Sequence, residues 1–174
     1  MNIIHKIWIR FLTWFGDIYL ATTPPKVKAK DIRKLLELLQ PGDIICRRYI
    51  YYLDAYFIKG KYSHSGIIIN REMMIHSIAE GVDYIDIIDY TKDCDGFILL
   101  RPNIDIQRSI AFAKRQVGKP YDFLFDKSEK DAFYCHELVF YSLAEGSLTI
   151  AAQIPMHIIY AEDVIKFCQK IYEV

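Results

Sequence analysis

The sequence of 174 residues has few cysteines, no net charge and no long apolar run. Its four cysteines form no CxxC or CxxH pair and are too sparse for a disulfide scaffold, which favours a reducing compartment. Because 22 basic side chains balance 22 acidic ones, we expect no nucleic-acid partner. No apolar run reaches the length of about 18 residues that a membrane-spanning helix needs. The sequence also lacks internal repeats and low-complexity tracts, which excludes a repeat architecture.

The composition is that of a compact globular protein. Apolar residues make up 52% of the chain and charged residues 25%, with 13 Tyr and 10 Phe. This excludes a disordered chain and supplies enough apolar side chains for a sizeable core. At this length we expect one domain, with room for a short appendage.

Residues 1–29 are expected to form that appendage, an amphipathic helix followed by the connector TTPPKVKAK. Arg10 and Asp17 interrupt the apolar pattern, which disfavours a cleaved secretion signal. Two interpretations stay open: a helix on a membrane surface, and a helix docked on its own domain or on a second copy. The protein is therefore expected to be cytoplasmic or peripherally attached to a membrane through residues 1–20. Helical spacing predicts one apolar face, with Lys6 and Arg10 mostly on the other side, and this face contains Ile4, Ile7, Trp8, Phe11, Phe15 and Ile18.

Residues 30–174 are expected to form the main domain. Apolar spacing and stop signals predict helices over 30–39, 106–117, 134–144 and 163–171. Alternating or short apolar runs predict strands over 43–47, 64–69, 73–78, 82–87 and 97–101. The aromatic segment 49–59 fits helix or strand, and we favour helix. The summed pattern is α+β, an antiparallel, small barrel-like sheet packed against helices.

Cys135 lies at the start of the predicted helix 134–144, after a polar loop. The unpaired amides and the partial positive charge of a helix start stabilise a thiolate, so this position suits a nucleophile. An isolated cysteine on an apolar helix face is, however, more often a small buried residue. That structural interpretation applies to Cys46, Cys94 and Cys168.

Two histidines make the catalytic interpretation stronger. If residues 70–72 form a three-residue hairpin loop, Gly66 pairs with His76, and His64 projects from the same face of the sheet as His76. His64 would then serve as the base beside the thiol and His76 would hold its imidazole in one tautomer. A loop with an even number of residues would put His76 on the opposite face. Glu80 is the reserve third residue, followed by Asp83 and Asp86.

The same three side chains, His64, His76 and Cys135, could instead bind a catalytic zinc ion. The short ligand spacing typical of zinc sites is missing, so we expect no metal and no other cofactor. His136 follows Cys135 by one residue and points about 100° away on a helix, which predicts a surface or supporting residue.

Four motifs carry a resemblance to a known family: LQPGDII at 39–45, YSHSGIII at 62–69, GKPYDFLF at 118–125 and FYCHELV at 133–139. Together they resemble the circularly permuted NlpC-type papain-like cysteine hydrolases, particularly the YiiX-like branch, in which the histidine strand precedes the cysteine helix. The spacing of the two histidines and the cysteine is also similar to that in lecithin retinol acyltransferase and its phospholipid-acting relatives.

The resemblance implies that Cys135 is the nucleophile, His64 the base and His76 the third residue of a Cys-His-His triad. It also implies that Tyr121 and Tyr62 help to bind the substrate or the oxyanion. One departure is that YiiX-like members often have a glutamate in place of His76. Asp43 in the PGD motif is expected to be structural and to cap a turn.

Together these expectations predict a cysteine hydrolase that cleaves an amide or peptide bond, for example in a cell-wall peptide, through an acyl-enzyme. The same triad serves esters, so a lipid acyl hydrolase or acyltransferase of this fold is an alternative. The second alternative is a non-catalytic module that binds a peptide or a lipid.

Overall fold

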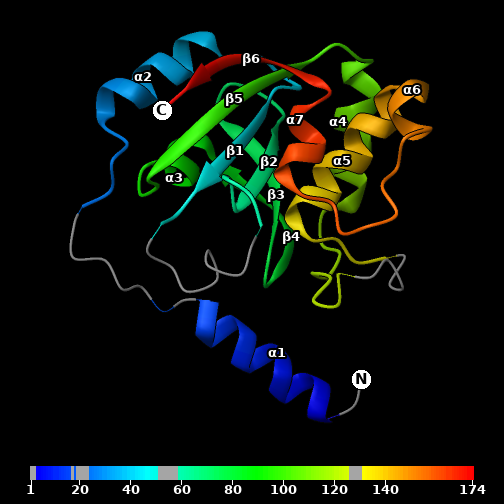
Figure 1. Cartoon of the computed structure of the whole chain (residues 1–174). Helices are drawn as coiled ribbons and strands as arrows, with labels where there is room; N and C mark the ends of the chain where they lie inside the picture. Colours follow the sequence, from blue (N-terminus) through cyan, green and yellow to red (C-terminus); the bar gives the residue numbers. More distant parts are fainter. Residues whose placement is uncertain (1–2, 17, 19–23, 51–58, 126–130) are drawn as a thin grey trace.

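The structure is a computed structural model that describes residues 3–16, 18, 24–50, 59–125 and 131–174. The helix expected over 49–59 falls mostly outside the described residues. The described chain forms one open sheet with helices on both faces (Figure 1).

The sheet has six strands in the order β4-β3-β2-β1-β5-β6, so β4 and β6 are its edges. All five neighbouring pairs are antiparallel. This confirms the α+β class with an antiparallel sheet, but the sheet has two edges and is not the barrel-like one that was expected. The strands are β1 (Ile44–Arg48), β2 (His64–Ile68), β3 (Met73–Ile78), β4 (Gly81–Asp86), β5 (Gly96–Pro102) and β6 (Cys168–Glu173).

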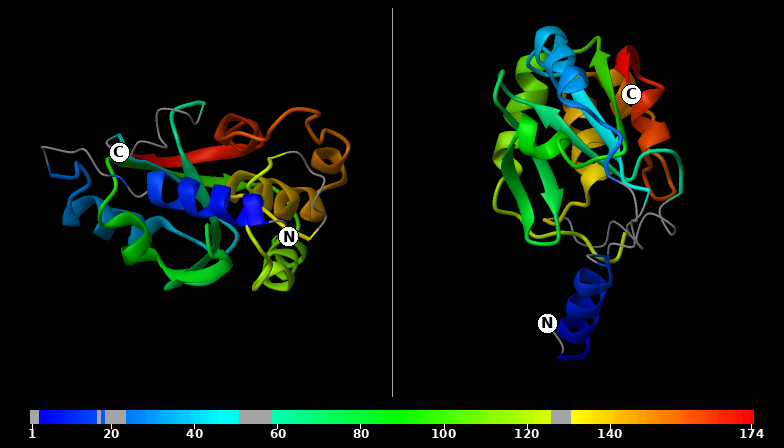
Figure 2. Two further views of the ribbon diagram at one scale, coloured as in Figure 1. Left: turned by 90° about the horizontal axis from the view of Figure 1, so that it is seen from below. Right: turned by 90° about the vertical axis from the view of Figure 1, so that its left-hand side faces the viewer.

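Seven helices are assigned in the described part of the chain. The helix α1 stands apart from the sheet and its covering helices (Figures 1 and 2). The helices are α1 (Ile3–Gly16), α2 (Ala29–Leu38), α3 (Ile87–Thr91), α4 (Ile106–Gln116), α5 (Cys135–Gly146), α6 (Leu148–Ala151) and α7 (Ala161–Ile165). None of the helices in these ranges is long and apolar enough to cross a bilayer.

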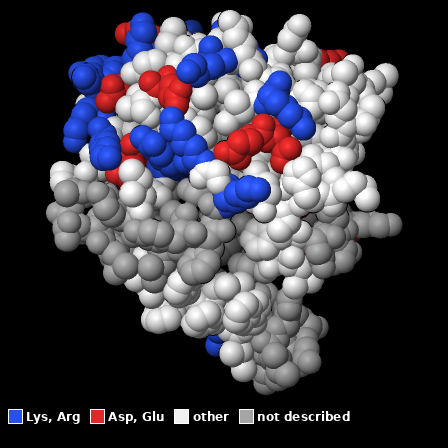
Figure 3. Space-filling view, viewed as in Figure 1, with Lys and Arg blue, Asp and Glu red and all other residues white. Residues whose placement is uncertain are grey.

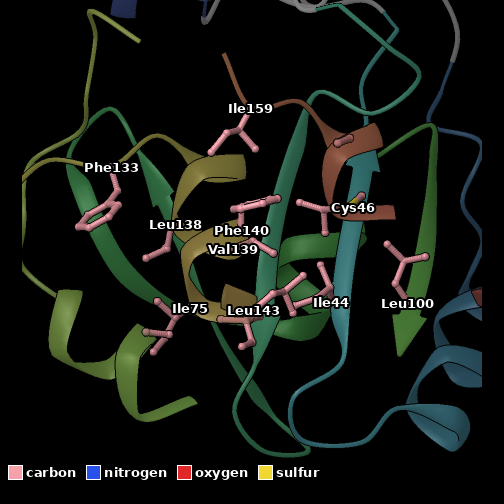
Figure 4. Close-up of a cluster of buried hydrophobic side chains, with 14 of the residues drawn as sticks. Ile44, Cys46, Ile75, Leu100, Phe133, Leu138, Val139, Phe140, Leu143 and Ile159 are labelled. Atoms are coloured by element: carbon pink, nitrogen blue, oxygen red, sulfur yellow. The ribbon is translucent and has the colours of Figure 1, made fainter. Parts of the chain in front are cut away.

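Alternation along the strands gives the sheet a separate apolar core on each face. In β1, Ile44 and Cys46 belong to the core under α5, whereas Ile45 belongs to the core under α2 and α3. Figure 4 shows Leu138, Val139 and Phe140 of α5 lying over the strands of the first core. The two faces therefore carry different helices, and each strand residue is assigned to one of them by its parity.

Two sequence expectations are corrected near the ends of strands. The helix expected over 163–171 is wrong: α7 ends at Ile165, and β6 then pairs with β5. Pairing along the free edge of β5 outweighs the local helical spacing, because Ile171 and Tyr172 reach the second core as strand residues. The strand expected to end at residue 87 ends at Asp86, where the Asp86 carboxylate accepts hydrogen bonds from the first amides of α3. Asp86, one of the reserve residues, thus caps α3.

The visible surface carries charges of both signs. In the view of Figure 3, Lys and Arg gather over α2 and the neighbouring strands with Asp and Glu among them. Pairs such as Lys34 with Glu37 account for this mixture.

Asp43 fixes the entrance to β1, as expected for a structural residue. Its carboxylate is buried and accepts from the Gln40 backbone N–H at 2.9 Å, which closes the turn before the strand. The same carboxylate takes two bonds from Arg101 of β5, at 2.8 and 2.7 Å. A fork of this kind joins the turn to the neighbouring strand with defined geometry.

We expect Asp43→Asn to lower the free energy of unfolding by about 3 kcal/mol, because it leaves the Arg101 guanidinium without its charged partner. Urea denaturation measures this change. Lys34→Gln, which breaks an exposed pair, is the matched control and should change stability by less than about 1 kcal/mol. Equal effects of the two substitutions would contradict the role of Asp43.

Candidate active site

The β2–β3 hairpin has the register that the three-residue loop predicts. Gly66 pairs with His76 and Ile68 with Met74, and the Ile69 N–H donates to the Met73 carbonyl at 3.0 Å. His64 and His76 therefore project from the same face. Their rings meet, with Nε2 of His64 3.1 Å from Nδ1 of His76.

A tyrosine of the short helix α3 packs against both imidazoles. The ring of Tyr90 is fully buried, and its centroid lies 5.6 Å from that of His64 and 5.8 Å from that of His76. Its hydroxyl donates to the Ile45 carbonyl at 3.3 Å. The histidine pair is thus held between the sheet and an aromatic ring, which limits rotation of both imidazoles.

Cys135 is the first residue of α5, and its sulfur lies beside the segment that leads into β2. The Sγ atom is 3.9 Å from the Ser63 carbonyl, and the backbone N–H of Ser65 acts on the same sulfur. The β2–β3 ladder covers Gly66–Ile68, so the sulfur bonds backbone groups that lie just beyond it, next to His64. The backbone groups that the sulfur contacts, those of Ser63 and Ser65, flank His64 in the sequence.

The loop before α5 and the start of this helix are bonded to the other face of the same hairpin. The Ser65 hydroxyl and Nδ1 of His136 are 2.8 Å apart, and the Ser77 hydroxyl donates to the Phe133 carbonyl. His136 is 3% exposed, which excludes the surface position considered for it. Serines that follow His64 and His76 directly in sequence therefore hold the helix that carries Cys135.

Burial sets the protonation states of the site. It lowers the pKa of His64 well below 6.5 and that of His76 to about 4, and the charge of Arg47 adds to both shifts. Burial raises the pKa of the Cys135 thiol to about 11, although the amides of Ser65 and His136 lower it. At neutral pH the resting site accordingly contains a neutral thiol and two neutral imidazoles.

The remaining predicted residues lie in different surroundings. The Tyr62 hydroxyl donates to Glu173 of β6 at 2.8 Å. Tyr121 is half-buried and packs against Phe123, with ring centroids 4.9 Å apart. Glu80 is exposed in the turn between β3 and β4, whereas Asp83 of β4 pairs directly with His76. Asp83 therefore shares the face of the histidines and is better placed to support them than Glu80.

The structure also shows where the other three cysteines lie and whether a metal-binding group is present. Cys46 and Cys94 are fully buried in the two cores, and Cys168 is half-buried in β6. Within the described ranges no three His, Cys, Asp or Glu side chains are grouped closely enough to hold a metal ion. The arrangement of His64, His76 and Cys135 therefore does not fit a zinc site.

Sequence reasoning missed two residues of this region, Tyr90 and Arg47. Tyr90 lies in a helix that was not predicted, and Arg47 lies opposite His64 in the β1–β2 ladder. The strand alternation of 43–47 carried a signal for Arg47, since a cation in a central strand needs a partner or a function.

Comparison with known proteins identifies a family and a solved structure of similar fold. The model of the permuted papain-like amidase family YaeF/YiiX, C92, matches residues 38–169. The fold is similar to the crystal structure of the metalloprotein yiiX from Escherichia coli O157:H7, with a TM-score of 0.63 and 19% identity. That match covers 79% of this chain and 98% of the other. No curated protein matches the sequence.

We expect Gly66→Ala to destabilise the protein by about 1–3 kcal/mol and to displace His76, because a Cβ at this position overpacks the hairpin. That atom would lie 2.9 Å from the Ile75 carbonyl and 3.3 Å from the His76 Cβ. Urea denaturation and the NMR shifts of the His76 ring measure the two effects.

Gly118→Ala is the control for backbone strain. Its Cβ would meet nothing within 4 Å, but its φ of 87° disfavours an alanine. It should reduce stability by about 1 kcal/mol and leave the His76 signals unchanged. Unshifted His76 signals in Gly66→Ala would show that the close contact does not position the ring.

Proposed function

Because the chain belongs to the permuted papain-like amidase family, we propose that it is a cysteine amidase that cleaves an amide or peptide bond through an acyl-enzyme. The resemblance expected from the sequence motifs is confirmed by this membership and by the yiiX-like fold. The observation that carries the proposal is the 3.1 Å contact of His64 with His76, at the place where the Cys135 sulfur meets the backbone beside His64.

The proposed tautomers follow from the atoms in contact. His64 uses Nε2 to meet His76, which leaves Nδ1 to accept the thiol proton. His64 must then carry its own proton on Nε2 and donate it to Nδ1 of His76. His76 carries its proton on Nε2, on the side of the ring not used by His64. In this arrangement His76 orients the base without exchanging protons with the substrate.

The proposed reaction begins with a neutral pair, because the pKa of the thiol is raised and that of His64 is lowered. As Cys135 Sγ bonds to the substrate carbonyl carbon, its proton moves to Nδ1 of His64. The backbone N–H of Cys135, which lies in the first turn of α5, is suited to stabilise the carbonyl oxyanion. His64 then protonates the leaving amine, and water releases the acyl group with His64 again as the base.

The experiment that tests this function uses a panel of activated amide and ester acyl probes. We expect the wild type to gain the mass of one acyl group and Cys135→Ala to gain none, with His64→Ala slowed by about 100-fold or more. Intact-protein mass spectrometry measures the adduct. Cys168→Ala, which removes the half-buried thiol of β6, is the matched control and should label like the wild type.

The outcomes of this experiment separate the alternatives. Faster labelling by amide probes supports the amidase, and exclusive labelling by lipid esters supports the acyl hydrolase or acyltransferase. A well-folded wild type with no adduct from any probe contradicts both and favours a non-catalytic binding module.

A second candidate, action on lipid acyl groups, is favoured by the surface of α1. Its aromatic side chains are exposed, with Trp8 51% and Trp14 62% accessible, and Trp8 stacks on Phe11. Lys6 and Arg10 are exposed on the same helix. Indole rings beside cations suit the headgroup region of an anionic membrane, so we propose that α1 lies on such a surface.

We expect Trp8→Ser/Trp14→Ser to reduce co-sedimentation with phosphatidylserine-containing vesicles by at least about tenfold, because the helix loses its two largest interfacial side chains. Leu148→Ser is the matched control, since Leu148 of α6 is 83% exposed but lies outside α1. Unchanged sedimentation of the double variant would refute membrane contact through α1. A concentration-dependent dimer that the double variant loses would assign α1 to a second copy instead.

A further inference from the structure

Arg47 occupies the position directly opposite His64 in the β1–β2 ladder. Directly opposed residues of antiparallel strands share a face, so its guanidinium lies on the side of the sheet that carries both histidines. The chain thus places a permanent cation next to the proposed base, with one strand, β2, between it and the strand of His76.

Aromatic rings and a backbone carbonyl hold this cation in place. The guanidinium carbon lies 4.0 Å from the ring centroid of Tyr90 and 4.8 Å from that of Tyr49, and one terminal nitrogen donates to the Tyr90 carbonyl. Tyr90 is the ring that also packs against His64 and His76. Arg47 and the two imidazoles are therefore assembled around one side chain.

The charge of Arg47 is not neutralised by the part of the chain that the structure describes. No carboxylate in these ranges forms an ion pair with it, and its buried Nε has no hydrogen-bond partner there. An arginine cannot lose its proton to relieve this situation. A cation without a counter-ion beside a nucleophile is suited to stabilise negative charge that develops during a reaction.

The effect of this charge reaches every ionisable member of the site. Burial has the larger effect on all three groups. The charge of Arg47 lowers the pKa of His64 and His76 in the same direction as burial, and lowers the pKa of Cys135 against the effect of burial. The opposing carboxylate is Asp83, which raises the pKa of His76. Of the other ionisable groups around these three, His136 lowers the pKa of His64, and Cys135 raises the pKa of Cys46, Tyr90 and Tyr134.

We propose that Arg47 is a positioning residue of the catalytic centre, whose fixed positive charge keeps His64 a neutral base and stabilises the thiolate of Cys135. This inference rests on the proposed function. During attack the thiol proton moves from Sγ to Nδ1 of His64 while the C–S bond forms, and Arg47 neither gives nor takes a proton. The imidazolium formed beside a cation is a stronger acid, which speeds return of its proton to the leaving amine.

The test compares Arg47→Met, Arg47→Lys and Arg48→Met in the full-length protein. Arg48→Met removes the same charge from the adjacent position of β1, which faces the other side of the sheet. Iodoacetamide alkylation of Cys135, followed by peptide mass spectrometry across pH, reports thiolate formation. NMR titration of the His64 ring reports its protonation.

Arg47→Met should move the His64 titration upward by about one pH unit and slow alkylation of Cys135 about tenfold at pH 8. Arg47→Lys, which restores the charge, should return both curves towards the wild type, and Arg48→Met should leave them in place. Unchanged curves in a folded Arg47→Met protein would overturn the proposal. So would a wild-type His64 that titrates at or above 6.5, a measurement that needs no variant.

These readouts do not depend on substrate turnover. If the protein hydrolyses no acyl probe but Arg47→Met shifts the His64 titration and slows Cys135 alkylation, the role of Arg47 stands and the proposed amidase function is refuted. If the protein hydrolyses amides but the titrations of His64 and Cys135 do not change in the Arg47 variants, the proposed function stands and the role of Arg47 is refuted.

Discussion

The register of the β2–β3 hairpin is the constraint on which the site depends. The pairing of Gly66 with His76 puts the two imidazoles on one face and within 3.1 Å of each other. A slip of one residue would turn His76 towards α5 and Ser77 towards Tyr90. The missing side chain of Gly66 is part of this constraint, because the His76 Cβ and the Ile75 carbonyl occupy the space around it.

The same alternation explains how helix and sheet position one another. Ser65 and Ser77 face the opposite side from the histidines and bond His136 and the Phe133 carbonyl. Two polar contacts thus fix the start of α5 while its apolar side chains pack on Ile67 and Ile75. The sulfur comes to the end of the β2–β3 ladder because these contacts determine where the helix begins.

Local signals in the sequence were sufficient to predict the hairpin and its histidine pair. The three residues 70–72 between two apolar runs determined the parity, and polar residues before Cys135 marked a helix start. The relation of Arg47 to Tyr90 could not be predicted in this way, because 43 residues separate them and α3 is only one turn long. The prediction of a helix over 163–171 was wrong for a related reason. The segment 168–173 is a strand because β5 offers a free edge, which is a property of the assembled sheet.

The raised pKa of Cys135 has a consequence beyond the reaction itself. Peroxides oxidise thiolates far faster than thiols, so a nucleophile that ionises only when a substrate accepts its electrons is protected between turnovers. Cys135 is also only 5% exposed, which limits the access of oxidants. The burial that keeps this thiol protonated therefore also protects it against oxidation to sulfenic acid.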